Sequence, residues 1–173
     1  PMIASQDHKR IFDGDKGPNT GGMGTYAPAP VLTDTLRDEA MKTILEPMVA
    51  AMQKEGMPYV GCLYAGLMIT PQGPKVVEFN ARFGDPETQV VLPLLDSDLG
   101  QIMMACATGT LTADMVKWKD SSAACVILAS KGYPESSSKG DVIRGDIKQH
   151  DTTIVFHSGT KLIGDEYVTN GGR

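Results

Sequence analysis

The segment VVEFNARFGDPE, residues 76–87, places three side chains suited to cations or phosphate at alternate positions, namely Glu78, Asn80 and Arg82. Alternate residues of a β-strand point to the same face, so the Glu78 carboxylate and the Asn80 amide oxygen can reach one cation. Mg²⁺ prefers oxygen ligands of this kind and completes its shell with water and phosphate. Arg82 would lie on the same side if the strand continued, and its planar guanidinium suits phosphate oxygens. The alternative is an edge strand that carries solvated polar residues and a salt bridge.

A second candidate is the glycine-rich segment GPNTGGMG, residues 17–24. Consecutive glycines leave backbone N–H groups free to converge on an oxyanion, as they do in anion-binding nests. The segment is not a P-loop, because no Gly-Lys-Ser/Thr follows it. A flexible connector is the alternative interpretation of the same residues.

The elements that must position these residues follow from apolar spacing and turn signals. Strands are predicted over 60–70 and 75–80, joined by a turn at 71–74, so that Glu78 and Asn80 stand at the end of a hairpin. A helix is predicted over 33–55, with a kink or break near Glu46 because proline follows. The Gly- and Pro-rich stretch 6–30 is predicted to be a loop without a regular strand through its middle.

The rest of the chain indicates a helical segment followed by strands. A helix is predicted over 90–107, interrupted at Pro93 and at 96–98. A boundary near 120–122 then gives two predicted domains, 1–120 and 121–173. Strands are predicted in the second domain over the ranges 123–129, 141–143, 154–158 and 167–169.

Composition narrows the functional classes. The chain has 173 residues, 41% of them hydrophobic, and a net charge of -5, which argues against a broad nucleic-acid-binding face. No apolar run reaches the length of a membrane span, and no secretion leader is expected at the first residues. The three cysteines, Cys62, Cys106 and Cys125, form no CxxC pair, and buried free thiols in a reducing cytosol are expected rather than metal ligands. Because the chain starts at Pro1 and stops at Arg173 without a terminal element, both ends are expected to be cut.

These segments together resemble one enzyme family. The strings QDHKR, GDKGPNTGGMGTYAPAP, YVGCLYAGLM and KVVEFNARFGDPETQVVLPLL are similar to glycinamide ribonucleotide synthetases. The later strings ASKGYP, GDVIRG, VFHSGTKL and VTNGGR match the same family in the same order. The resemblance covers essentially the whole chain, and RFGDPETQ is close to a family signature.

The resemblance implies an α+β fold. The chain would hold the second lobe of an ATP-grasp fold, an antiparallel sheet with helices, followed by part of a β-rich carboxy-terminal domain. The first lobe would be missing. The implied reaction joins phosphoribosylamine to glycine through glycyl phosphate in purine synthesis, with ATP as substrate and Mg²⁺ or Mn²⁺ as cofactor. The implied location is cytoplasmic, with no nucleic acid or membrane as partner and with a possible fusion to later purine-pathway enzymes.

The resemblance also implies roles for individual residues. Glu78 and Asn80 match the metal ligands, and Arg82 and Asp85 match catalytic positions. The turn of Asp85 and Pro86 matches the wall of the acceptor pocket. The loop near the phosphoribosylamine site is matched by four residues, Thr20, Gly21, Gly22 and Met23.

Two departures and two alternatives accompany this interpretation. Many ATP-grasp enzymes carry a further metal-binding acid on the first hairpin strand, where this chain has Gly66. Relatives continue GYP with glycine and an aromatic residue, whereas this chain has Glu-Ser-Ser-Ser at 135–138.

One alternative function is that of another ATP-grasp carboxylate–amine ligase with a different amine, against which the GPNTGGMG loop argues. The other is a non-catalytic truncated module.

Overall fold

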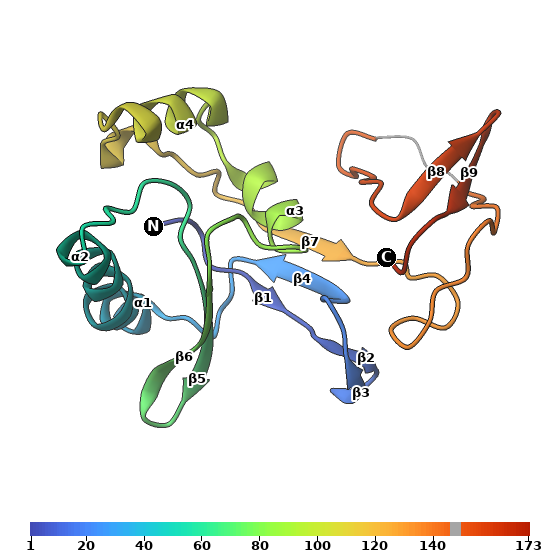
Figure 1. Cartoon of the computed structure of the whole chain (residues 1–173), viewed down its shortest axis with the longest axis horizontal. Coiled ribbons are helices and arrows are strands. Elements are labelled where there is room, and N and C mark those ends of the chain that lie inside the picture. Colours follow the sequence, from blue (N-terminus) through green and yellow to red (C-terminus); the bar gives the residue numbers. More distant parts are fainter. Residues whose placement is uncertain (146–149) are drawn as a thin grey trace. The chain divides into compact units, whose positions relative to one another are not determined.

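The computed structural model describes residues 1–145 and 150–173 and mixes helices with antiparallel strands, so the predicted α+β class is confirmed (Figure 1). The chain divides into two compact units. The first unit contains Pro1–Gln6 and Tyr26–Ala124, and the second contains Asp7–Thr25 and Cys125–Arg173. The glycine-rich segment thus belongs to the same unit as the tail of the chain. The predicted domains 1–120 and 121–173 stay a prediction.

The first unit holds the long hairpin and most of the helices. Its elements are α1 (Asp34–Ala40), the π-helical turn η1 (Met41–Leu45), α2 (Glu46–Lys54), β5 (Tyr64–Thr70), β6 (Gly73–Asn80), α3 (Thr88–Val91), the 3-10 turn η2 (Leu92–Leu94), α4 (Leu99–Thr108) and the 3-10 turn η3 (Ala113–Met115). Its buried apolar residues lie on the helices and on the segment before α1, at Ala27, Ala29, Ala40, Val90, Val91, Leu94 and Ala105. None of the helices built by the described residues is long and apolar enough to cross a bilayer.

The second unit is built from short antiparallel pairs. It contains β2 (Arg10–Phe12) paired with β3 (Lys16–Asn19), and β8 (Thr160–Ile163) paired with β9 (Glu166–Thr169). Three further strands, β1 (Gln6–Asp7), β4 (Gly24–Ala27) and β7 (Ala123–Val126), form a sheet in the order β1-β4-β7. The division between the two units falls within these three strands.

The predicted hairpin is present with tighter bounds. Strand β5 begins at Tyr64 rather than residue 60, and the turn is limited to Pro71 and Gln72, since Thr70 pairs directly with Gly73. Gly73 has φ +87°, a left-handed conformation that favours glycine. Thr70 Oγ1 donates to the carbonyl of Gly73 over 2.9 Å and accepts from the N–H of Gln72 at 3.2 Å. This short turn fixes the register of the strand that carries the candidate site.

The predicted helix over 33–55 is also present, and Thr33 caps it by accepting from the N–H of Leu36. The expected irregularity before Pro47 takes the form of the π-helical turn η1, so the helix continues to Lys54 without a break. Proline lacks the N–H that an α-helical bond to Thr43 would need, and the wider turn accommodates this loss. Gly56, with φ +76°, follows the helix end.

Helix α2 packs beside the end of the hairpin. The two enclose a cavity of about 170 Å³ lined by Met48, Val49, Met52, Tyr59, Leu63, Phe79, Asn80 and Ala81. The lining is apolar except at Asn80 and the Tyr59 hydroxyl. The apolar stripe of the helix therefore supports the strand end from which Asn80 projects.

The predicted interruptions of the later helix are confirmed. Pro93 lies in η2, between α3 and the extended residues before Asp98. Asp98 then caps α4 by accepting from the N–H of Gln101 at 3.0 Å. Gly109, with φ +71°, ends that helix.

The prediction that the stretch 6–30 has no strand through its middle is wrong. β2 and β3 form a hairpin there, with Phe12 opposite Lys16. Gly14 and Asp15 adopt φ values of +70° and +57°, so residues that looked like loop punctuation make a tight hairpin turn. Glycine and aspartate gave the correct signal for a turn, and its interpretation as an unstructured loop was the error.

The predicted strands of the tail are partly wrong. Only 123–126 of the range 123–129 is a strand, and 141–143 contributes a single bridge between Val142 and Val168. The range 154–158 forms no strand, whereas the unpredicted β8 pairs with β9. Gly164, with φ +59°, allows the two-residue turn between them, and that turn selects 160–163 as the partner strand. The prediction at 167–169 is confirmed by β9.

Candidate functional site

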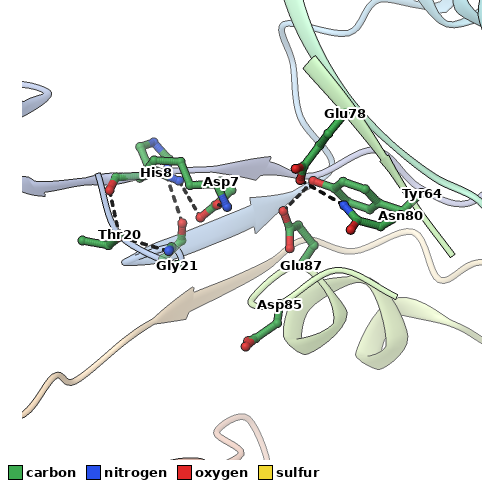
Figure 2. A network of polar contacts seen from close by, with 12 residues as sticks. Asp7, His8, Thr20, Gly21, Tyr64, Glu78, Asn80, Asp85 and Glu87 are labelled. Atoms are coloured by element: carbon green, nitrogen blue, oxygen red, sulfur yellow. Dashed lines mark hydrogen bonds and ion pairs between the residues drawn. The ribbon is translucent and has the colours of Figure 1, made fainter. Parts of the chain in front are cut away.

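Glu78 and Asn80 point to the same face at the end of β6, as the alternation of the strand predicted (Figure 2). The amide nitrogen of Asn80 donates to Glu78 Oε1 over 2.9 Å. This hydrogen bond does not engage the Asn80 amide oxygen or the second carboxylate oxygen of Glu78. Glu78 is exposed and Asn80 is half-buried, so the pair offers oxygen atoms at the surface of the first unit.

Strand β5 places Gly66 directly opposite Glu78, and Tyr64 opposite Asn80. The register shifts between Gly66 and Leu67, where Leu67 pairs with Val76, so Val77 bulges from β6 immediately before Glu78. A Cβ on Gly66 would lie 3.1 Å from the Cγ of Glu78. The missing side chain at Gly66 therefore leaves the space in which the Glu78 side chain lies.

Arg82 does not continue the strand, because β6 ends at Asn80. Its side chain is exposed and donates from Nη1 to the carbonyl of Phe83 over 2.8 Å. Asp85 is exposed too, and it accepts from Nε2 of Gln89 at 2.8 Å. Both residues thus lie in the turn that follows the cation-facing pair, within the same unit.

The turn ends in two buried residues, Pro86 and Glu87. Glu87 is only 5% exposed, and its Oε1 accepts from the hydroxyl of Tyr64 at 2.8 Å. Figure 2 shows this bond beside the Glu78–Asn80 pair. Sequence reasoning did not select either Glu87 or Tyr64 as a site residue. The sequence did carry a signal for Glu87, because this acidic residue lies just before an apolar helical segment. A carboxylate in such a place becomes buried and needs a hydrogen-bond partner.

The residues at the hairpin end fit a hard divalent cation as a partial ligand set. A carboxylate and an amide oxygen are the donors that Mg²⁺ takes from proteins. Across residues 1–145 and 150–173, no three His, Cys, Asp or Glu side chains come together as a metal-binding group. A cation bound by Glu78 and Asn80 would therefore draw its remaining ligands from water and from a phosphate-bearing substrate.

The glycine-rich segment of the second unit does not form the predicted anion-binding nest. Its backbone N–H groups from residue 20 to residue 23 all donate within the protein. Their acceptors, in chain order, are the Lys9 carbonyl at 2.7 Å, the Tyr133 hydroxyl at 2.9 Å, Thr20 Oγ1 at 3.0 Å and the His8 carbonyl at 2.8 Å. The nest was inferred from glycine content alone, which reveals neither the local acceptors nor the Tyr133 hydroxyl that the tail supplies.

The end of the chain holds the same segment. Arg173 donates from Nη1 to the carbonyl of Gly22 over 3.1 Å. A Cβ on Gly21 would lie 2.7 Å from Nε and Nη2 of Arg173, so the guanidinium lies directly against the backbone of Gly21. Gly22 has φ +117°, which a side chain would strain. Gly21 and Gly22 are thus held by contacts with Tyr133 and Arg173 in their own unit, whereas Thr20 and Met23 are held by the carbonyls of Lys9 and His8.

Two ionisable groups next to the cavity of the first unit have perturbed pKa values. Burial raises the pKa of the Tyr59 hydroxyl, with further contributions from Cys62 and Cys106. Burial likewise raises the pKa of the Cys62 thiol, with a smaller contribution from Cys106. The Tyr59 hydroxyl donates to the Cys62 carbonyl over 2.8 Å. All three cysteines are half-buried thiols, and the raised pKa makes Cys62 a weak nucleophile.

Comparison with known proteins defines the class. Residues 1–88 match the family model described as the ATP-grasp (A) domain of phosphoribosylglycinamide synthetase, and residues 123–173 match the C domain of the same synthetase. A crystal structure of a phosphoribosylamine–glycine ligase from Thermotoga maritima superposes with a TM-score of 0.83 at 32% identity, covering 99% of this chain and 42% of that one. The fold is therefore that of an ATP-grasp segment followed by part of a carboxy-terminal domain.

Similar proteins of known name identify the family within this class. The chain is 54% identical to a phosphoribosylamine–glycine ligase of Caulobacter vibrioides over 98% of its length. It is 53% identical to a bifunctional purine biosynthetic protein of Schizosaccharomyces pombe and to a trifunctional one of Gallus gallus. The chain belongs to the phosphoribosylglycinamide synthetase family.

The chain spans only part of these relatives. It covers 40% of the Caulobacter vibrioides ligase, 21% of the Schizosaccharomyces pombe protein and 17% of the Gallus gallus protein. The matches therefore establish the family of this chain, and the ligase activity is named only for the longer relatives.

Proposed function

We propose that the chain forms part of a phosphoribosylamine–glycine ligase, which uses ATP to join glycine to phosphoribosylamine in purine biosynthesis. The observation that carries this proposal is the Glu78–Asn80 pair, hydrogen-bonded at the end of a hairpin in a chain of this family. The two oxygen atoms can bind a divalent cation, and the arginine that follows can bind the phosphates of a nucleoside triphosphate.

In this proposal Glu78 and Asn80 hold Mg²⁺ or Mn²⁺. When bound, the cation supplies positive charge that screens the phosphate oxygens of ATP during phosphoryl transfer. Arg82 adds a second positive charge to the same region, because its side chain is exposed in the turn beyond β6. Redirection of its Nη1 from the Phe83 carbonyl to a phosphate oxygen needs only a side-chain rotation.

The proposed reaction has two steps. In the first, a carboxylate oxygen of glycine attacks the γ-phosphorus of ATP, the bond to the β-phosphate oxygen breaks, and glycyl phosphate and ADP form. In the second, the amine of phosphoribosylamine attacks the carbonyl carbon, the bond to phosphate breaks, and the nitrogen loses a proton. Catalysis of such steps is largely positioning and charge stabilisation.

We assign the acceptor side of the reaction to the two turns that the resemblance selected. Asp85 and Pro86 would line the acceptor pocket, with Asp85 held by Gln89. Thr20, Gly21, Gly22 and Met23 would contact phosphoribosylamine. Their N–H groups, the Thr20 hydroxyl and the carbonyls of Gly22 and Met23 all have partners within the protein. We therefore assign the carbonyl oxygens of Thr20 and Gly21 to the ligand.

Two assays test the proposal in the complete ligase. Sustained ADP release should require glycine together with an amine acceptor, and omission of glycine or of phosphoribosylamine should abolish formation of glycinamide ribonucleotide. Hydroxylamine added in place of the amine should trap glycyl phosphate as glycine hydroxamate, since acyl phosphates react with strong nucleophiles. A different amine that replaces phosphoribosylamine with equal efficiency would favour another carboxylate–amine ligase. Absence of ADP release with all substrates present would favour a non-catalytic module.

We also propose the finer attributes that accompany this function. The location is cytoplasmic, in keeping with three cysteines that stay as thiols. The domains are 1–120, from the ATP-grasp second lobe, and 121–173, from the carboxy-terminal domain. The bifunctional and trifunctional relatives support a fusion of the parent protein to later purine enzymes.

A further inference from the structure

Glu87 is a buried acidic residue at the start of a helix, a position where acidic side chains usually cap the helix. It directly precedes α3, yet its side chain makes no capping hydrogen bond to that helix. Its carboxylate accepts instead from Tyr64, the first residue of β5, over 2.8 Å. Burial of a carboxylate costs free energy unless the group is hydrogen-bonded, and here the hydrogen bond comes from Tyr64 on β5. We therefore ask what this bond holds in place.

The Tyr64 ring lies between this carboxylate and the cation-facing pair. A Cβ on Gly84 would lie 2.8 Å from Cδ of Glu87 and 2.9 Å from Cε2 of Tyr64, so both side chains pack over Gly84. On the other edge of the ring, a Cβ on Gly66 would lie 3.5 Å from Cε1 of Tyr64 and 3.1 Å from Cγ of Glu78. The ring therefore occupies the space between two glycines, with Glu87 at one side and Glu78 at the other.

The strand register places Tyr64 and Glu78 on the same face of the hairpin. Tyr64 is directly opposite Asn80, and Gly66 is directly opposite Glu78, so these residues share one face of the hairpin. Because Gly66 has no side chain, the Tyr64 ring is the side chain that β5 places next to Glu78 and Asn80 on that face. Rotation of the ring would change the space available to Glu78.

We propose that Glu87 is a positioning residue of the cation site: its buried carboxylate fixes the Tyr64 hydroxyl, and the Tyr64 ring then holds Glu78 beside Asn80. This inference rests on the proposed function. It assigns no contact between Glu87 and the cation or the substrates. It accounts for glycine at position 84, where a Cβ would clash with the Glu87 carboxylate and the Tyr64 ring, and a Cβ at Gly66 would press on Cγ of Glu78.

The test measures cation affinity in the complete ligase by a Mn²⁺ titration followed by electron paramagnetic resonance, with a non-hydrolysable ATP analogue present. Tyr64→Phe keeps the ring and removes the hydroxyl, and Glu87→Ala removes the acceptor. Loss of one net hydrogen bond should raise the half-saturating Mn²⁺ concentration about fivefold in each variant. The double variant should bind Mn²⁺ no more weakly than either single variant, because both changes break the same link.

Two further variants separate positioning from stability. Glu87→Gln keeps an acceptor oxygen for Tyr64, so its Mn²⁺ affinity should stay within about twofold of wild type. Tyr26→Phe is the matched control, since the Tyr26 hydroxyl donates to Gln6 Oε1 over 2.7 Å elsewhere in the same unit. It should lower the melting temperature as Tyr64→Phe does, without any change in Mn²⁺ affinity.

Wild-type Mn²⁺ affinity in Tyr64→Phe and Glu87→Ala would overturn the inference, and so would a wild-type protein that binds no Mn²⁺. If Glu87→Ala does not fold, Tyr64→Phe alone decides the outcome. The proposed function fails separately, in a protein that binds Mn²⁺ and nucleotide but releases no ADP with glycine and phosphoribosylamine.

Discussion

The hydroxyl of Tyr133 accepts the backbone N–H of Gly21 over 2.9 Å, although the two residues are 112 positions apart in the chain. This bond links the loop that we assign to phosphoribosylamine with the segment after β7. Tyr133→Phe should leave the Gly21 N–H without its acceptor and loosen the loop. The KM for phosphoribosylamine should rise about fivefold, while the KM for ATP stays unchanged.

The matched control for that variant is Tyr167→Phe, because Tyr167 lies in the same unit and stacks on His157, with ring centroids 4.2 Å apart. Steady-state kinetics with each substrate varied in turn provides the measurement. Equal rises in both KM values, accompanied by a lower melting temperature, would show that the bond supports folding alone.

Glu78→Gln should reduce turnover of the complete ligase at least 100-fold, to order of magnitude, because it removes charge from the cation site and keeps the shape of the side chain. The assay is ADP release at saturating Mg²⁺. Glu55→Gln, an exposed change beyond the end of α2, is the control. Near-wild-type turnover of Glu78→Gln would remove this residue from the site.

Arg82→Lys keeps the positive charge and loses the planar, two-pronged donor of arginine. Turnover should still fall about tenfold or more, because a single ammonium group cannot reproduce two parallel hydrogen bonds to a phosphoryl group. The effect should lie in kcat rather than in the KM for ATP. Full activity of this variant would mean that Arg82 only contacts the backbone of its own turn.

Burial raises the pKa of the Cys62 thiol, so the reactive thiolate forms at a higher pH than in an unfolded chain. Iodoacetamide labelling of Cys62, followed by peptide mass spectrometry across a pH series, should show its half-maximal rate at a higher pH in the native protein than in urea. Coinciding pH profiles in the two conditions would contradict the effect of burial.

The isolated chain of residues 1–173 should not catalyse ligation, and it should show no saturable binding of Mg-ATP in the micromolar range. Glu78 and Asn80 provide two oxygen donors, and Mg²⁺ releases its water reluctantly unless other groups hold the phosphates. Calorimetry of the chain with Mg-ATP and a glycine-dependent ADP-release assay provide the measurements. Micromolar affinity together with turnover would show that this chain is a complete site.

The hairpin and its cation-facing pair were predictable because they depend on short-range signals. Alternation put Glu78 and Asn80 on one face, and the turn residues between 70 and 73 fixed the register. The cap at Thr33 and the irregularity before Pro47 were local signals of the same kind. Local patterns of this kind specify an element without knowledge of its neighbours.

The remaining features depend on contacts between distant segments. Glycine content suggested free N–H groups in the loop, but Tyr133 lies 112 residues away and supplies one of the acceptors. The burial of Glu87 depends on Tyr64, which is 23 positions earlier on another element. Strand β8 was missed because its apolar alternation is weak and its pairing is decided by the turn at Gly164. No periodicity within one segment carries such information.

The membership of residues 7–25 in the same unit as residues 125–173 has a consequence for synthesis on the ribosome. The glycine-rich loop emerges early, and the Tyr133 hydroxyl that accepts from Gly21 emerges 112 residues later. At typical translation speeds, this interval lasts roughly 6 to 22 seconds. Arg173, which donates to the Gly22 carbonyl, is separated from it by 151 positions and arrives later still. During this time the loop has its local acceptors, such as the carbonyls of Lys9 and His8, but lacks Tyr133 and Arg173. Its final conformation therefore forms only after the end of the chain has been synthesised.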